Sequence, residues 1–122
     1  MGNETRDEAE PARLAITSRT TGRITVLTVQ GEIDHDSAGQ FHQALNTGYS
    51  SSPPQVVVDL SGVTFMDSTG IQALAVTHRS TQSAHGWIRI AAPNDAVLRV
   101  IQIVGLDTVV ACYPTLDQAI NP

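Results

Sequence analysis

Lysine is absent from this chain of 122 residues, whose seven basic residues are all arginines, and twelve acidic residues outnumber them. The formal net charge is -5 at pH 7. Binding to nucleic-acid phosphates or to an anionic membrane surface needs clustered cations. The composition therefore predicts a protein with no direct nucleic-acid or membrane ligand, and it excludes any mechanism that requires a lysine.

Cysteine is nearly absent as well. Cys112 is the single cysteine, so the chain cannot form an internal disulfide, and one thiol does not make a zinc site. Its apolar neighbours predict a buried thiol. No apolar run approaches the roughly 20 residues of a membrane-spanning helix, and the polar, acidic N-terminus does not form a signal peptide. We expect a cytoplasmic protein that needs no metal ion or cofactor.

The residues that are present indicate one folded domain. Hydrophobic residues make up 41% of the chain, which is too many for a disordered protein, and the length fits a single domain with its own core. Residues 1–12 differ from the rest, because they lack hydrophobic periodicity and include four acidic residues and a proline. We expect residues 1–12 to form a flexible acidic tail and residues 13–122 to form the domain.

Strand-like and helix-like segments alternate along the domain. Short apolar runs that are typical of strands occur at residues 14–16, 24–29, 56–60, 87–91 and 109–112. Stretches with helical periodicity begin near residues 38, 70, 95 and 116. The order β-β-α-β-α-β-α-β-α predicts an α/β domain with a mixed, mainly parallel five-stranded sheet and four helices, most of them on one face. The first two strands should form an antiparallel hairpin.

The stretch of residues 55–80 organises this domain. Residues 56–60 read Val-Val-Val-Asp-Leu, which is typical of a strand buried on both faces, and the Ser-Gly pair after them should end it. The predicted inner face of the following helix comprises Ile71, Leu74, Ala75 and His78. The side chains that we expect in the core include Ile33, Val57, Phe65, Ile71 and Leu74.

Residues 67–70, Asp-Ser-Thr-Gly, connect this strand to the helix. All three polar side chains can accept hydrogen bonds from the free N–H groups of a first helical turn, and Thr69 and Gln72 have capping-box spacing, so the capping residue stays open. A phosphorylated hydroxyl here would also meet these N–H groups and the positive end of the helix dipole. Gly70 leaves room for a partner near the backbone. The residues alone allow Ser68 to be a plain helix cap or a modification site.

The strand, its Asp-Leu-Ser-Gly sequence and the Asp-Ser-Thr-Gly-Ile motif resemble those of the STAS family, and most closely those of the stand-alone bacterial anti-sigma factor antagonists. A second family motif, Gly-x-[Leu/Ile]-Asp at the end of an earlier strand, corresponds to residues 31–34, and a weaker Gly-Leu motif corresponds to residues 105–106. The resemblance runs in order from about residue 13 to residue 120. It implies a single STAS-like domain in which Ser68 is the regulatory phosphorylation site.

The resemblance also implies partners. The unphosphorylated protein would bind an anti-sigma factor that is also a serine kinase, and this binding would release the sigma factor. Phosphorylation of Ser68 would end the binding, and a serine phosphatase would restore it. The two motifs end neighbouring strands in the family pattern, so we expect them to meet. The predicted partner-binding residues are Asp34, His35, Asp67, Ser68, Thr69, Gly70 and Gln72.

Three other functions fit parts of the sequence. A phosphorelay receiver would use Asp59 at the end of a buried strand, but the acidic pair and the lysine that receivers need are missing. A hydrolase would use Ser68 as its nucleophile, but the Gly-x-Ser-x-Gly elbow is absent, and His35 after Asp34 is the only base worth testing. A STAS subunit of a lipid-transport or other multiprotein assembly is an open alternative. We expect no enzymatic activity.

Overall fold

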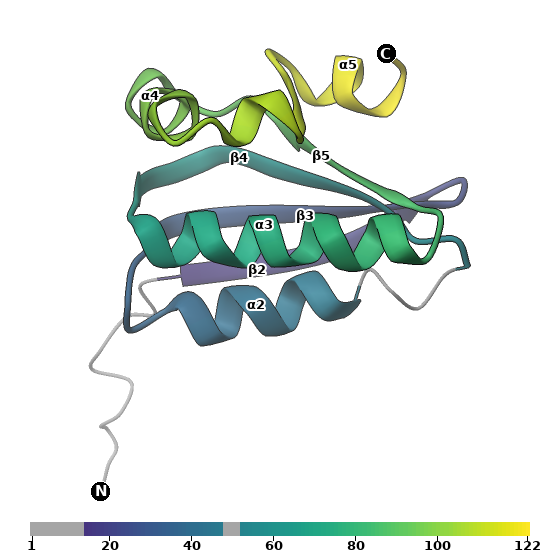
Figure 1. Ribbon diagram of the computed structural model, residues 1–122, viewed down its shortest axis with the longest axis horizontal. Helices are drawn as coiled ribbons and strands as arrows, with labels where there is room; N and C mark the ends of the chain where they lie inside the picture. Colours follow the sequence, from purple (N-terminus) through teal and green to yellow (C-terminus); the bar gives the residue numbers. More distant parts are fainter. Residues whose placement is uncertain (1–13, 48–51) are drawn as a thin grey trace, which may run out of the picture.

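The computed structural model describes residues 14–47 and 52–122. The predicted tail at residues 1–12 lies outside the described residues. So does Gly48, which follows the first stretch of helical periodicity and is a plausible end for that helix. Within them, strands and helices follow the expected order (Figure 1). The strands are β2 (Leu14–Thr21), β3 (Ile24–Ile33), β4 (Gln55–Met66), β5 (Trp87–Ala91) and β6 (Ala111–Tyr113). The helices are α2 (Ala38–Thr47), α3 (Ser68–Ser83), α4 (Asp95–Ile103), the 3-10 helix η2 (Leu106–Thr108) and α5 (Leu116–Ile120).

The five strands form one sheet in the order β2-β3-β4-β5-β6. Strand β2 pairs antiparallel with β3, and the remaining neighbours pair in parallel. This is the mixed, mainly parallel sheet that the sequence predicted, with a longer opening hairpin. Because parallel strands run in the same direction, the carboxyl ends of β3 to β6 lie toward one edge of the sheet.

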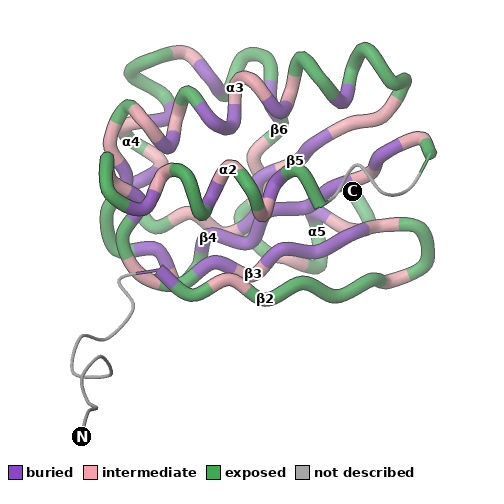
Figure 2. Tube along the Cα trace, turned by 90° about the horizontal axis from the view of Figure 1, so that it is seen from below, coloured by how far each residue is buried: buried purple, intermediate pink, exposed green. Residues whose placement is uncertain are grey.

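The helices are divided unequally between the two faces of the sheet. Helices α2, α3 and α4 share one core, to which they contribute Phe41, Leu74 and Ile101. Helix α5 packs on the opposite face, where Ala119 belongs to a second, smaller core with Val57. Burial is concentrated along β3, β4 and β5, the central strands (Figure 2). The continuous apolar run of β4 follows from its position, because its alternate side chains enter two different cores.

Strand β4 does not end at the Ser-Gly pair of residues 61–62, as the sequence predicted, but continues to Met66. At this pair the parallel register with β3 slips, forming a β-bulge. A Cβ atom on Gly62 would lie 2.7 Å from Cγ of Gln30 on β3. The glycine therefore lets two strands approach closely at a bulge, and it does not end the strand.

A second bulge turns Phe65 away from the core, where the sequence had placed it. Two consecutive residues of β3 pair with Val63 and Phe65, which are two positions apart on β4. The extra residue, Thr64, reverses the alternation of side chains, so Val63 is buried whereas Phe65 is 49% exposed. The prediction for Phe65 was wrong because hydrophobic periodicity does not reveal a bulge.

Helix α3 buries a different face from the predicted one. Its buried residues are Gly70, Ala73, Leu74, Thr77 and Thr81. Threonine gives no apolar signal in the sequence, but the hydroxyls of Thr77 and Thr81 donate hydrogen bonds to backbone carbonyls of the preceding turn. Their polar atoms are thereby satisfied, and the side chains can be buried. Among the other predicted core residues, Ile33, Val57 and Leu74 are buried and Ile71 is half-buried.

The last strand starts at Ala111, two residues later than predicted. Gly105 adopts a left-handed conformation with φ of 78° after α4, and the chain then forms η2. The N–H of Val110 donates to the carbonyl of Leu106 (2.9 Å), which keeps this segment out of the sheet. The final helix begins as predicted, since the side chain of Thr115 accepts a hydrogen bond from its first turn.

Candidate functional site

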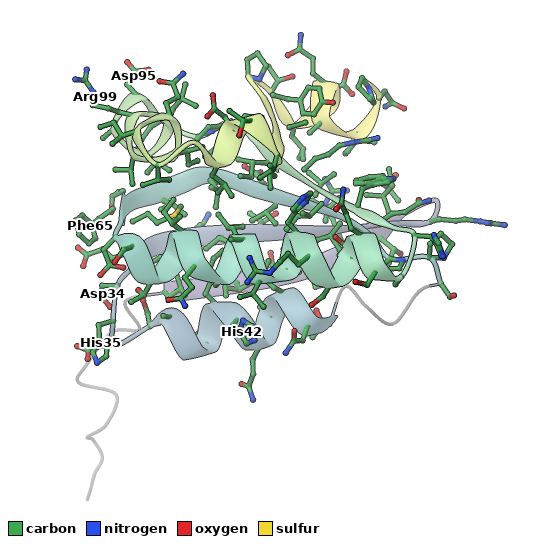
Figure 3. All side chains as sticks on the ribbon, viewed as in Figure 1. Asp34, His35, His42, Phe65, Asp95 and Arg99 are labelled. Atoms are coloured by element: carbon green, nitrogen blue, oxygen red, sulfur yellow. The ribbon has the colours of Figure 1, made fainter. Side chains whose placement is uncertain are left out.

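The two sequence motifs meet at the carboxyl ends of β3 and β4. Ile33 pairs with Met66 at the end of the parallel ladder, and the N–H of Asp67 donates to the carbonyl of Ile33 (3.1 Å). Asp34 and Asp67 therefore follow neighbouring strands at the same edge of the sheet. Asp34 lies at this end of the molecule with His35 beside it (Figure 3). The predicted meeting of the two motifs is confirmed.

Asp34 shapes the turn between β3 and α2. Its Oδ1 accepts hydrogen bonds from the N–H groups of Asp36 (3.0 Å) and Ser37 (3.1 Å). The buried Ser37 hydroxyl accepts from the N–H of Asp34 (2.9 Å) and donates to the carbonyl of Glu32 (2.8 Å). These bonds fix the path of the chain after the first motif. They leave the predicted partner residue His35 exposed in the turn.

Asp67 is the residue that caps α3, which settles the question that the sequence left open. Its carboxylate accepts hydrogen bonds from the N–H of Thr69 (2.9 Å) and from the Thr69 hydroxyl. The Thr69 hydroxyl, and then the N–H groups of Thr69 and Gly70, hold the pKa of the Asp67 carboxyl below its usual value. Desolvation and the neighbouring charge of Asp34 act in the opposite direction. Two carboxylates thus stand close together at the start of this helix.

Ser68 and Thr69 are neighbours with different surroundings. The Thr69 side chain is half-buried, and its hydroxyl is held by Asp67. Ser68 is the first residue of α3 and is exposed, and its hydroxyl makes no hydrogen bond with another residue of the described chain. Of these two adjacent hydroxyls, only that of Ser68 is open to another molecule.

Gly70 has a different role from the one that its lack of a side chain predicted. It is buried, and a Cβ atom on it would lie 2.6 Å from Cγ of Met66 and 2.7 Å from Cγ2 of Ile33. The room that this glycine leaves is therefore filled by side chains from the ends of β3 and β4. Gly70 allows α3 to start directly against the sheet, which brings Ser68 to the edge beside Asp34.

Gln72 lies one helical turn after Ser68 and is exposed. It lines a groove between α2 and α3, together with His42, Thr69 and Val76. The predicted partner residues therefore fall into two groups. Asp34, His35 and Ser68 lie at the edge of the sheet, whereas Gln72 lies on the side of α3 that faces α2.

Phe65 is a residue at this edge that the sequence analysis assigned to the core. It stands two residues before Asp67, at the carboxyl end of β4, with about half of its surface exposed. Regular strand alternation along the sequence cannot show which way the Phe65 side chain points, because its direction depends on the bulge at Thr64. The Ser-Gly pair upstream was the one available signal of irregular pairing.

Asp59 does not occupy the position of a receiver's phosphate acceptor. It lies within β4 and is only 8% exposed, and its Oδ1 accepts a hydrogen bond from the N–H of Ser61 (2.9 Å). It braces the first bulge, as an ordinary structural carboxylate does. In residues 14–47 and 52–122 we find no group of three or more histidine, cysteine or carboxylate side chains that could hold a metal ion.

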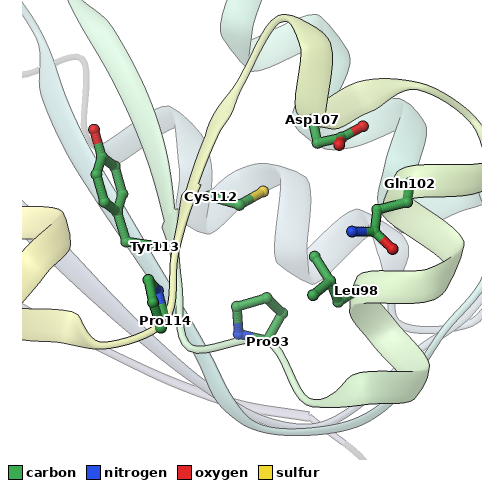
Figure 4. A pocket seen from close by; sticks show the side chains of 7 residues that line it. All are labelled: Pro93, Leu98, Gln102, Asp107, Cys112, Tyr113 and Pro114. Atoms are coloured by element: carbon green, nitrogen blue, oxygen red, sulfur yellow. The ribbon is translucent and has the colours of Figure 1, made fainter.

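A separate pocket of about 330 Å³ lies between α4 and β6 (Figure 4). Leu98 and Gln102 of α4 line one side, and Cys112 and Tyr113 of β6 line the other. Cys112 is half-buried, and desolvation, with a smaller effect of Asp107, raises the pKa of its thiol to about 11. The thiol is therefore protonated and weakly nucleophilic at neutral pH.

The described helices include none that is long and apolar enough to cross a membrane. The fold, with its antiparallel first strand and its motif at the start of α3, defines a STAS domain. The STAS domain family model matches residues 15–119. The chain belongs to this family.

Several of the similar proteins within the family are antagonists of anti-sigma factors. The chain is 28% identical over 111 residues to the anti-sigma-F factor antagonist RsfB of Mycobacterium tuberculosis, covering 91% of this chain and 90% of the relative. A crystal structure of an anti-sigma factor antagonist from Mycobacterium paratuberculosis superposes with a TM-score of 0.80 at 34% identity, covering 88% of this chain and 91% of that one. An anti-sigma-B factor antagonist of Listeria monocytogenes is 27% identical over 97 residues, which cover 80% and 84% of the two chains. These relatives are regulators and not enzymes, which agrees with the expectation for this chain.

Proposed function

We propose that this protein is an anti-sigma factor antagonist that is switched off by phosphorylation of Ser68. Its partner is an anti-sigma factor with serine kinase activity, and a serine phosphatase reverses the modification in the same compartment, the cytoplasm. Binding of the unphosphorylated protein frees a sigma factor and so promotes transcription. The observation that carries the proposal is the exposed Ser68 hydroxyl, which bonds to no residue of the described chain and lies at the edge where the two family motifs meet.

The surroundings of Ser68 explain why one phosphate would act on binding. Phosphorylation adds about -1.5 to -2 charges at pH 7. Asp67 and Asp34 already give this edge a negative field. The two carboxylates are close enough that the charge of Asp34 acts to raise the pKa of Asp67. A partner carboxylate ~4 Å from the phosphate would be repelled by ~4 kcal/mol per unit charge at an effective dielectric of 20. That repulsion is sufficient to dissociate a transient complex.

The fold should tolerate the same phosphate. Ser68 is exposed at the first turn of α3, where the positive end of the helix dipole favours a negative charge. The Asp67 cap does not use the Ser68 hydroxyl, so its hydrogen bonds to Thr69 survive the modification. Phosphorylation should therefore change affinity without unfolding the domain.

Three variants and phosphosite mapping test this proposal. Ser68→Ala should bind the partner kinase and accept no phosphate, whereas Ser68→Asp should bind at least tenfold more weakly, although one charge copies a phosphate imperfectly. Thr69→Ala is the matched control, and its Ser68 should still be phosphorylated. The measurements are mass spectrometry after incubation with the kinase and ATP, and a binding titration for each variant. Phosphate found mainly on Thr69 or Ser61 would contradict the proposal.

The lipid-transport alternative gives a different result in the same assay. Ser68→Ala, used as bait, should retain the anti-sigma factor, because this variant cannot be switched off. Recovery of a transporter ATPase in place of a kinase would support a STAS subunit of a transport assembly and overturn the proposed function.

A further inference from the structure

The edge that carries Ser68 also presents an aromatic side chain. Phe65 is 49% exposed and stands three residues before Ser68 on the same chain segment. Its outward direction is built into the fold, since the extra residue Thr64 in the β4 ladder reverses the side-chain alternation. Bulges that re-aim a side chain are common next to functional sites. With regular pairing between β3 and β4, the side-chain alternation would direct Phe65 into the core. The bulge therefore moves an aromatic side chain from the core to the surface.

The surface around Phe65 continues onto α4. Strand β5 pairs with β4 only as far as Asp59, so the carboxyl end of β4 has no strand on that side. Instead, the side-chain amide of Asn94, the residue that caps α4, donates to the carbonyl of Val63 (2.9 Å). The first turns of α4, with Asp95 and Arg99, therefore lie at the same end of the molecule as Phe65 (Figure 3).

We propose that Phe65 is the apolar anchor of the partner interface, and that the anti-sigma factor kinase receives it in an apolar pocket with a positively charged rim. This inference rests on the proposed function, because the occupant is the kinase that binds at Ser68. We expect a protein that covers the Ser68 hydroxyl to contact Phe65 as well, because Phe65 is three residues earlier, at the carboxyl end of β4 that leads into α3. Exposed aromatic side chains within a polar rim are the residues that most often dominate binding energy.

The charges around Phe65 define the rim of that pocket. Asp34, which is close enough to Asp67 to affect its carboxyl, lies on one side of Phe65 and Asp95 lies on the other, with Arg99 as the nearby cation of α4. A complementary surface is therefore positive around an apolar centre. The interface extends from the turn after β3, across the end of β4, to the start of α4. It is centred on the edge of the sheet and not on the groove between α2 and α3.

Phe65→Ala tests the anchor directly. With the purified anti-sigma factor kinase as the probe, the dissociation constant should rise about 10- to 100-fold, as for other central aromatic residues. Phe65→Leu should keep most of the affinity, because it retains an apolar side chain. Ile103→Ala is the matched control, since Ile103 is an apolar residue that is 76% exposed on the last turn of α4. Its affinity should stay within about threefold of the unmodified protein, which is the scatter of near-neutral interface residues.

The outcomes separate the anchor from the switch. One contrary result is that Phe65→Ala keeps an affinity within about threefold of the unmodified protein while Ser68→Asp still binds weakly. That result would overturn the role of Phe65 as the anchor and leave the proposed function standing. If the unmodified protein does not bind the kinase, both are overturned. Phe65→Ala loses the buried half of the side chain and should melt at a somewhat lower temperature. Its melting curve should still show a fully folded protein at the temperature of the titration, so a loss of affinity cannot be attributed to unfolding. Asp95→Arg should slow association at low salt, and an unchanged rate would remove α4 from the interface.

Discussion

At the scale of the residue, Asp67 connects stability to the site. It caps α3 through Thr69, and it contributes the charge that a phosphate on Ser68 would meet. Its neighbour Asp34, which follows β3, likewise combines a structural role with a negative charge at this edge. Its carboxylate holds the turn before α2. Carboxylates that hold turns cannot be removed without a cost in folding, so binding variants at this edge need stability controls. Ser68 is exempt, since its hydroxyl takes part in no turn of the described chain.

The hydrogen bonds of Asp67 predict a pH-dependent stability. Its pKa is lowered in the folded protein, so its stabilising effect is complete above the unfolded value of about 3.9 and is lost as the pH falls through the folded value. Asp67→Ala should therefore lower the free energy of unfolding by about 0.5–2 kcal/mol at pH 7. The difference from the unmodified protein should shrink below about pH 4. Urea unfolding at pH 7 and at pH 3 measures both values.

A neutral cap provides the control for this pH dependence. Asn94 caps α4 by accepting the N–H of Val97 (2.8 Å), and its side chain has no charge to lose. The cost of Asn94→Ala should be the same at both pH values. An Asp67→Ala cost that is equally independent of pH would show that the charge of Asp67 does not contribute to capping.

At the scale of the element, the order of segments was predictable because each has a local signal. Strand β5 has the predicted bounds, and α4 and α5 begin near the predicted residues 95 and 116, each after a polar cap. The errors arose where pairing between distant segments decides the outcome. The length of β4 and the direction of Phe65 depend on register with β3, and the first turn of η2 displaces β6. For the site, the meeting of the Asp34 and Ser68 motifs was expected from the resemblance to the STAS family, whereas the exposure of Phe65 near them was not.

The contact between α3 and the sheet gives a prediction from two glycines. A Cβ on Gly70 would overlap Met66 and Ile33, whereas one on Gly39 in α2 would meet nothing within 4 Å. Gly70→Ala should lower the free energy of unfolding by about 1–3 kcal/mol through overpacking, reduced in part by the better helix propensity of alanine. Gly39→Ala should raise it by about 0.5–1 kcal/mol, because alanine favours the helix. Urea unfolding of both variants tests the pair, and a Gly70→Ala protein as stable as Gly39→Ala would refute the close contact.

At the scale of the whole molecule, the sheet separates the proposed binding edge from a structural face. On that face the guanidinium of Arg89 lies 3.6 Å from the centroid of the Trp87 ring and donates to the carbonyl of Ala119 in α5 (3.0 Å). These contacts fasten α5 over Val57 in the smaller core. The proposed interface instead lies at the carboxyl ends of β3 and β4. Stability and partner binding should therefore respond to different substitutions.

A crossed pair of variants tests this separation. Arg89→Met should lower the free energy of unfolding by about 1–2 kcal/mol, because it loses a charge-assisted hydrogen bond and a cation–π contact. Its affinity for the partner kinase should be unchanged, whereas Phe65→Ala should lose affinity while remaining folded, with the stability loss of a half-buried side chain. Since the two residues share no contact, the double variant should show the sum of the two stability effects within about 0.3–0.5 kcal/mol. Urea unfolding and binding titrations of the unmodified protein, the two single variants and the double variant complete this double-mutant cycle. A weaker affinity in Arg89→Met alone would mean that the α5 face belongs to the interface or that it controls the edge through the sheet.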